Sequence, residues 1–168
     1  MRVALSVCVL VGMTGCRSGP QQWGPFRGQV IDDESGKPIA GANVMVLWIR
    51  EPPSLHFTQS FYDAQEAVTD AEGRFQIPQR RHFLTAWVQA PGLSVFVPGY
   101  LMQPPRVAPP DGQRYTDPTV VPMRSLKTLD ERCKYEPFGI RGDAQAWVPN
   151  FVRAERTYQS SLDCAGLR

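Results

Sequence analysis

Hydrophobic and polar residues alternate along several short segments of the chain, and this pattern predicts a β-rich domain. In segments 26–32, 74–77 and 83–90, every second residue is apolar or small. A period of two is typical of strands that bury one face. Segment 43–49 is apolar at nearly every position, which predicts a central strand buried on both faces. Further strands are predicted over 61–69, 93–101 and 114–123.

Turn-forming residues separate these segments. The chain holds 16 prolines and 14 glycines, which interrupt helices and favour a turn-rich β protein. We expect Gly36 and Gly73 to take the left-handed conformation in turns, and Asp70 to accept hydrogen bonds from the amides of its turn. Proline-containing loops are predicted over 51–60 and 103–111.

Apolar residues take a helical spacing in the last part of the chain. Their positions from 126 to 133 predict a short helix with Ser125 as its N-cap. A second helix is predicted to begin at Pro149, because proline suits the first turn of a helix, and to end near Cys164.

The first 15 residues have the pattern of an export signal. One positive charge, at Arg2, precedes an uncharged apolar stretch over 3–13, which is too short to span a bilayer as a helix. Two small residues then precede Cys16, which resembles the bacterial lipobox, where the cysteine receives lipid. We expect a lipoprotein signal peptide over 1–15 and lipidation of Cys16; an ordinary secretory signal is the alternative.

Cys133 and Cys164 remain as a pair in the mature protein once Cys16 is lipidated. An even pair of cysteines in an exported chain favours a disulfide bond. A zinc site is the alternative, but zinc needs further cysteine or histidine ligands nearby. The only histidines, His56 and His82, are each isolated in the sequence. We therefore predict a disulfide between the two cysteines.

These features divide the chain of 168 residues into four parts. They are a signal peptide over 1–15, a polar tether over 16–25, a β-domain over 26–123 and a C-terminal helical segment over 124–168. The chain is long enough to bury a hydrophobic core without metals. Its 18 Lys and Arg residues nearly balance 16 Asp and Glu, and no basic stripe stands out, so we expect no nucleic-acid partner.

Three sequence blocks follow one another in a distinctive order. They are Gly-x-Val over 28–30, Gly-Lys-Pro-Ile-Ala-Gly-Ala-x-Val over 36–44, and Thr-Asp-Ala-Glu-Gly-Arg-Phe over 69–75. Together they resemble the carboxypeptidase-regulatory-like family of transthyretin-like domains. The resemblance covers 26–90 well and continues to about 123. It implies an all-β fold, an antiparallel, immunoglobulin-like β-sandwich of the transthyretin type.

The residues that carry this resemblance have structural roles. Gly41 permits a bend at the entry to a strand, Ala42 lies where a larger side chain would separate two layers, and Phe75 fills the core. The resemblance therefore implies a scaffold, and a fold alone does not define a function. A related branch hydrolyses hydroxyisourate with a His/Arg/His set, but His56 and His82 lack that setting here.

Other combinations of reactive residues give weak indications of chemistry. His56 lies near Ser54 in a predicted loop, but a nucleophile, a base and an orienting acid are all needed for catalysis. The acidic residues 32–34 offer oxygen ligands for calcium, but a solvated turn is the preferred explanation for them. We expect no catalytic residue, no metal and no cofactor.

Aromatic residues gather around the predicted loop over 51–60. Exposed together, they would form a surface for sugar rings or for a protein partner. The alternative is that several of them fill the core. The candidate ligand-binding residues are Trp48, His56, Phe57, Phe61 and Tyr62.

These features lead to an expectation about function. We expect a non-catalytic protein that is held by its N-terminal lipid in the bacterial cell envelope, on the outer membrane and facing the periplasm. Its expected task is to contact another envelope protein, or to serve a structural role. Carbohydrate binding by the loop aromatics is the alternative, and a hydrolase is a more distant one.

Overall fold

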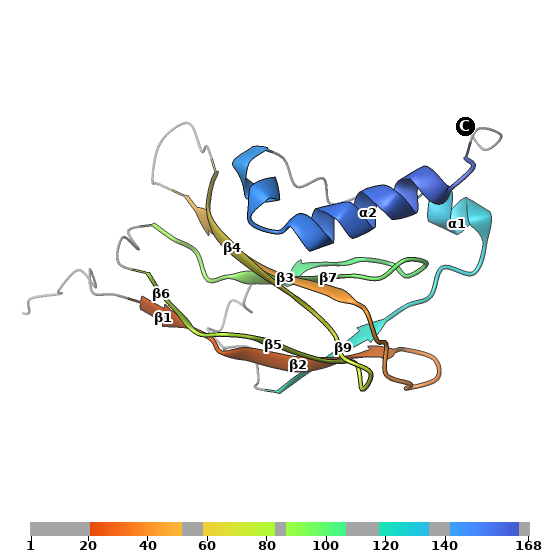
Figure 1. The fold of residues 1–168 in the computed structure, drawn as a ribbon, viewed down its shortest axis with the longest axis horizontal. Helices are drawn as coiled ribbons and strands as arrows, with labels where there is room; N and C mark the ends of the chain where they lie inside the picture. The colour runs from red at the N-terminus through yellow and green to blue at the C-terminus, as the bar shows by residue number, and fades with distance from the viewer. Residues whose placement is uncertain (1–20, 52–58, 83–86, 107–117, 135–141, 165–168) are drawn as a thin grey trace, which may run out of the picture.

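A computed structural model describes residues 21–51, 59–82, 87–106, 118–134 and 142–164. Strands make up most of the regular secondary structure in this part, and helices follow near the C-terminal end (Figure 1). The strands are β1 (Gln21–Trp23), β2 (Phe26–Asp32), β3 (Asn43–Arg50), β4 (Ser60–Val68), β5 (Arg74–Ile77), β6 (Arg80–His82), β7 (Gly92–Phe96), β8 (Gln103–Arg106) and β9 (Thr119–Met123). The helices are α1 (Leu129–Cys133), the 3-10 helix η1 (Gly142–Ala146) and α2 (Pro149–Ser161). The predicted mainly-β fold is confirmed.

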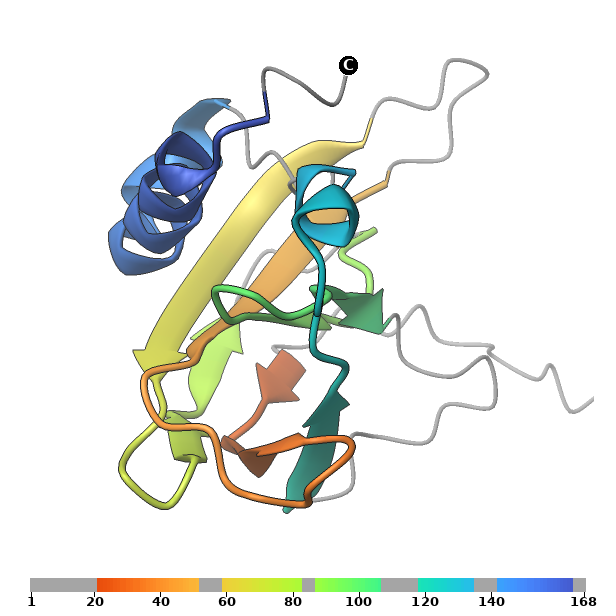
Figure 2. The same ribbon diagram turned by 90° about the vertical axis from the view of Figure 1, so that its right-hand side faces the viewer.

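The strands form two larger sheets and one small one. The first has the order β5-β2-β9, the second has the order β4-β3-β7-β8, and β1 pairs with β6 alone. Figure 2 shows α2 lying on one face of the sheet that contains β3 and β4. Strands β2 and β9 lie on the opposite face of that sheet. The described part of the molecule is therefore layered, with a helix on a sheet and that sheet on a second sheet.

The hydrophobic core fills the space between the two larger sheets. Val44, Val46 and Trp48 point into it from β3 and are fully buried. Val30 and Phe75 meet them from the opposite sheet. Ala42, at the entry to β3, is also fully buried in this core, as its small size led us to expect.

Strand β3 is apolar on both faces because both faces are covered. Its alternate residues Met45 and Leu47 point away from the inter-sheet core and contact α2. Phe151 and Val152 pack against them from the helix. The prediction of a central, doubly buried strand is therefore confirmed, and a helix provides the second cover.

One pairing departs from the predicted antiparallel arrangement. Strand β9 runs parallel to β2, with Gly28 opposite Thr119 and Asp32 opposite Met123. β9 follows β8, which belongs to the other sheet, so no hairpin turn fixes its direction. The remaining pairings between the described strands are antiparallel.

Gly28 shows why the Gly-x-Val block needs glycine. It lies opposite Phe75 across the β2–β5 pair. A Cβ atom at this position would lie 2.3 Å from the carbonyl oxygen of Thr119 and 2.6 Å from Cζ of Phe75. The aromatic ring therefore occupies the space that any larger residue would need.

The hairpin between β4 and β5 forms as the sequence predicts. The Asp70 carboxylate accepts hydrogen bonds from the amides of Glu72 (3.1 Å) and Arg74 (2.7 Å). Gly73 has a φ of +70°, and Gly36, in the turn between β2 and β3, has a φ of +68°. Both glycines take the left-handed conformation that most residues avoid.

The folded body begins earlier than the sequence pattern indicates. Residues 21–25, which we assigned to the tether, are part of it. Strand β1 pairs with β6, where Trp23 lies opposite Arg80, and neither strand was predicted. Trp23 also packs against the core. Both strands are only three residues long, which is too short for an alternating pattern to be recognised.

Three further predicted boundaries are wrong. Of the strand over 83–90, residues 87–90 contain a single bridge, from Val88 to Arg50, because Trp87 takes a φ of +60° that breaks an extended backbone. β7 ends at Phe96, where a strand over 93–101 was predicted. β8 lies inside the predicted loop over 103–111. Residues 83–86 and 107–117 lie outside the described part.

The two predicted helices form, but α1 begins at Leu129 with a different cap, and the 3-10 helix η1 between them was not predicted. The N-cap of α1 is Thr128 and not Ser125, because the Thr128 hydroxyl accepts a bond from the amide of Glu131 while the Glu131 carboxylate accepts one from the amide of Thr128. α2 has Pro149 in its first turn, as predicted.

The predicted disulfide between Cys133 and Cys164 is confirmed, with an S–S distance of 2.02 Å and a Cα–Cα distance of 5.7 Å. It joins the last residue of α1 to the segment that follows α2. None of the helices in the described part of the chain combines the length and apolarity that a bilayer crossing requires.

Candidate binding surface

Trp48 belongs to the core and not to a binding surface. Its side chain is fully buried, and its ring centroid lies 6.2 Å from that of Trp23 and 5.9 Å from that of Phe26. The prediction that Trp48 is available to a ligand is therefore wrong. The cause is its position in β3, where it shares the inward face with Val44 and Val46.

The two aromatic residues at the start of β4 separate onto opposite faces of the sheet. Tyr62 packs against the inter-sheet core, and the guanidinium carbon of Arg50 lies 4.9 Å from its ring centroid. Phe61 packs against the cluster under α2. Adjacent residues of a strand point to opposite faces, so these two rings do not form one surface. His56 and Phe57 lie outside the described residues.

Phe61 instead meets a residue from the far end of the sequence. Its ring centroid lies 6.0 Å from that of Trp147, with an interplanar angle of 53°. The guanidinium carbon of Arg80 lies 5.6 Å from the centroid of the same Trp147 ring. Trp147 is 47% exposed. We call Phe61, Arg80 and Trp147 the aromatic surface.

The Arg80 side chain is held in place by a buried carboxylate. Its Nη1 lies 3.0 Å from Oδ1 of Asp63, which is buried in β4. The same oxygen accepts a hydrogen bond from the amide of Ala64. An arginine that is fixed at one end and stacked on an aromatic ring presents an ordered cation at the surface.

Trp147 is fixed because the helix that follows it is anchored to the sheet. Val148, the N-cap of α2, offers no side-chain cap. The Glu66 carboxylate of β4 takes that role and accepts hydrogen bonds from the amides of Asn150 (3.0 Å) and Phe151 (2.9 Å). It also accepts one from the Asn150 side chain. A carboxylate at a helix N-terminus is favoured by both the free amides and the helix dipole.

No sequence pattern predicted that Arg80 and Trp147 lie together with Phe61. Trp147 lies 86 positions after Phe61 in the sequence. Apolar periodicity predicts which residues share a face of one element, but it does not predict which distant elements meet. What marks Trp147 as a surface residue is its exposure just before α2, and this exposure becomes known only from the fold.

Two of the acidic residues 32–34 are already engaged, Asp32 by hydrogen bonds within its turn and Glu34 by an ion pair. Oδ1 of Asp32 accepts bonds from the hydroxyl and the amide of Ser35, both 2.7 Å long, and these bonds lower the pKa of Asp32. Glu34 pairs with Nζ of Lys127 at 2.7 Å, which raises the pKa of that lysine. Burial raises the pKa of Tyr100, and its hydrogen bond to Asp32 adds to this effect.

Within the described residues, no group of three or more His, Cys, Asp and Glu side chains is placed to hold a metal ion. The backbone of His82 lies in β6, opposite Gln21. Ser54, His56 and the predicted lipidation site Cys16 lie outside the described part of the chain. Searches against protein families, curated proteins and solved structures find no match to this chain.

Proposed function

We propose that this chain is a non-catalytic, lipid-anchored protein of the bacterial cell envelope that binds another envelope protein through the aromatic surface. We further propose that its β-domain is a transthyretin-like sandwich of the carboxypeptidase-regulatory-like type. The three sequence blocks support this assignment. So do Ala42 and Phe75, which pack in the core between the two sheets, and Gly28, which leaves room for the Phe75 ring within its own sheet. Cys16 is the proposed lipid site. We place the anchored protein on the outer membrane, with its β-domain facing the periplasm.

The use of the carboxylates supports a binding role over catalysis. Asp63 holds Arg80, Glu66 holds α2, Asp70 closes a hairpin and Glu131 caps α1. Each of these acids makes a structural contact that a reacting group would have to give up. They stabilise a rigid body that presents side chains to a partner.

The observation that carries the proposal is the half-exposed ring of Trp147 between Phe61 and Arg80. Tryptophan and arginine are the residue types most enriched where a few side chains dominate the affinity of a protein interface. A ring that is already ordered loses little conformational entropy on binding. The arrangement therefore suits a protein partner that offers an apolar pocket with an acidic rim.

A glycan is the second candidate, because the exposed area of Trp147 also suits stacking on a sugar ring. The guanidinium of Arg80 would then donate to sugar hydroxyls. The protein partner is preferred because tryptophan and arginine side by side are typical of the residues that dominate protein interfaces.

The proposal is tested by photocrosslinking in living cells. A photoreactive phenylalanine analogue replaces Trp147 in the full-length protein, and a second strain carries it in place of Val120. Val120 is a suitable control because it is 54% exposed on the edge strand of the other sheet. We expect a discrete protein adduct from position 147 that is absent from position 120.

The partner identified in this way is then purified and tested directly. We expect Trp147→Ala to weaken its binding to the mature lipoprotein at least tenfold, and Val120→Ala to leave it unchanged. A glycan adduct, or glycan-array binding lost in Trp147→Ala, would support the second candidate. Equal adducts from both positions, or none from position 147, would overturn the proposal.

A further inference from the structure

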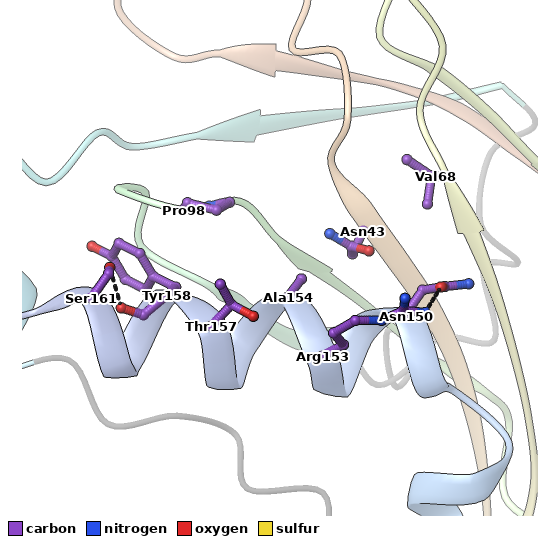
Figure 3. A pocket seen from close by; sticks show the side chains of 9 residues that line it. All are labelled: Asn43, Val68, Pro98, Asn150, Arg153, Ala154, Thr157, Tyr158 and Ser161. Carbon is purple, nitrogen blue, oxygen red and sulfur yellow. Dashed lines mark hydrogen bonds between the residues drawn. The ribbon is translucent and has the colours of Figure 1, made fainter.

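A groove of about 500 Å³ runs between α2 and the sheet beneath it, and it shares no residue with the aromatic surface (Figure 3). Asn43 of β3 and Val68 of β4 line one side. Arg153 and Tyr158 line the other side from α2, with Pro98 beside the Tyr158 ring. The volume lies within the range of known ligand sites.

Asn43 is the first indication that the groove receives a ligand. The residue is only 8% exposed, and Figure 3 shows its amide projecting from β3 toward α2. Among the described residues, its side chain has no hydrogen-bond partner. The hydroxyl of Tyr158 on the facing helix is buried and unpaired within the described part. Buried hydroxyls in proteins are nearly always hydrogen-bonded, so Tyr158 leaves an unused polar group beside the groove, and the Asn43 amide lines the groove itself.

Arg153 supplies a charge that nothing in the described chain neutralises. Its Nη2 donates to Oδ1 of Asn150 at 2.6 Å, so the guanidinium is oriented by a neutral amide. No carboxylate of the described residues lies within ion-pair distance of it. An oriented guanidinium with free N–H groups suits a carboxylate, which it binds with two parallel hydrogen bonds.

We propose that this groove binds an extended acidic segment of a partner protein. The Asn43 amide can both donate to and accept from a peptide group. An acidic side chain of the segment pairs with Arg153, and an apolar side chain packs against Val68 at one end of the groove or Pro98 at the other. This proposal is independent of the aromatic surface, because it rests on different residues.

The test uses the mature lipoprotein in detergent micelles and two libraries of fluorescent nine-residue peptides. In the first library an apolar residue is followed two positions later by Asp or Glu. In the second, Asn or Gln replaces the acid. We expect members of the acidic library to bind, measured by fluorescence anisotropy, at least tenfold more tightly than their neutral counterparts.

The variants separate the groove from general electrostatics. We expect Arg153→Gln to weaken binding of the acidic peptides at least tenfold, and Asn43→Asp to weaken it as strongly by placing a like charge in the groove. Arg156→Gln is the matched control on the same helix, because its guanidinium donates to Gln145 and does not line the groove. We expect it to change the affinity less than twofold.

Three outcomes would overturn this proposal. The first is equal binding of the acidic and neutral peptides, or no binding of either. The second is an equal loss of affinity in Arg153→Gln and Arg156→Gln, which would show a general charge effect. The third is binding of N-acetylglutamate as tight as that of the peptides, which would show a site for small carboxylates. Circular dichroism of each variant checks that α2 remains folded.

Discussion

Single residues of this protein join elements that are distant in sequence, and Glu66 is the clearest example. Its carboxylate accepts two backbone amides at the start of α2, more than 80 positions away. We expect Glu66→Ala to lower the free energy of unfolding by about 1–2 kcal/mol, as loss of an N-cap does. Urea unfolding measures this change. The control is Glu72→Ala in the exposed hairpin turn, and an equal loss there would contradict the capping role.

Gly28 allows a second prediction at the same scale. A Cβ atom there would meet the Thr119 carbonyl and the Phe75 ring at less than 3 Å. We expect Gly28→Ala to destabilise the protein by about 2 kcal/mol or more, because the strand and the ring must both move. Gly36→Ala, where a Cβ meets open space but φ is positive, should cost about 1 kcal/mol in thermal or urea unfolding. A larger loss of stability in Gly36→Ala than in Gly28→Ala would show that close packing does not determine the requirement for glycine at position 28.

Residue-level patterns predicted local structure well and long-range structure poorly. The hairpin closed by Asp70 and Gly73 was predicted because all its determinants lie within five positions. Trp48 was assigned to the wrong environment, because periodicity showed that β3 is buried on both faces but not that Trp23 would cover this ring. The contact of Phe61 with Trp147 depends on how α2 docks, which no local pattern contains.

At the scale of elements, α2 is fixed at both ends. Glu66 holds its first turn, and the disulfide from Cys164 to Cys133 ties the segment after its last turn to α1. The cysteines are 31 positions apart, and closing such a loop stabilises a protein by about 3–4 kcal/mol in the chain-entropy estimate. We expect the Cys133→Ser, Cys164→Ser double variant to unfold at correspondingly lower urea concentration.

Hydrogen exchange measures which elements lose stability when the disulfide is removed. In the double variant we expect the amides of α2 to lose protection, while those of β3, buried on both faces, keep it. Phe151 and Val152 still hold the helix on the sheet, so α2 should loosen without the β-domain unfolding. An equal loss of protection in β3 and α2 would mean that helix and sheets unfold as one unit.

The cap of α1 makes the stability of this region depend on pH. The amides of Thr128 and Lys127 donate to the Glu131 carboxylate and lower its pKa. The native state then binds fewer protons than the unfolded state. The stabilisation is therefore complete above the ordinary glutamate pKa of 4.5 and is lost as the pH falls through the lowered value.

The measurement for this pH dependence compares two variants. We expect Glu131→Gln to be less stable than the wild type at pH 7, with the difference shrinking as the pH falls below 4.5. Glu72→Gln should match the wild type throughout this range. A difference for Glu131→Gln that stays constant down to pH 3 would show that its charge has no part in the cap.

At the scale of the whole molecule, the predicted lipid site and the folded body are separated by a short stretch of chain. β1 begins at Gln21, five positions after Cys16. Five residues span at most about 18 Å when fully extended. If Cys16 carries lipid, the end of the domain with β1 and β6 must lie close to the membrane. The hairpin turn at 70–73 lies at the opposite end of β5 (Figure 1).

This geometry predicts a fixed orientation that fluorescence quenching can measure. A fluorophore on Arg81→Cys, at the exposed surface of β6, should be quenched strongly by headgroup-labelled lipids when the protein is reconstituted in vesicles. The same fluorophore on Ala71→Cys, in the hairpin turn, should be quenched weakly. Inserting a flexible Gly-Ser segment after Cys16 should reduce the difference in quenching between the two positions, because a longer tether lets the domain turn.

Two outcomes would contradict these expectations. Equal quenching at both positions with the native tether would contradict the predicted orientation of the domain. Membrane binding that survives Cys16→Ser would show that the lipid is not the anchor.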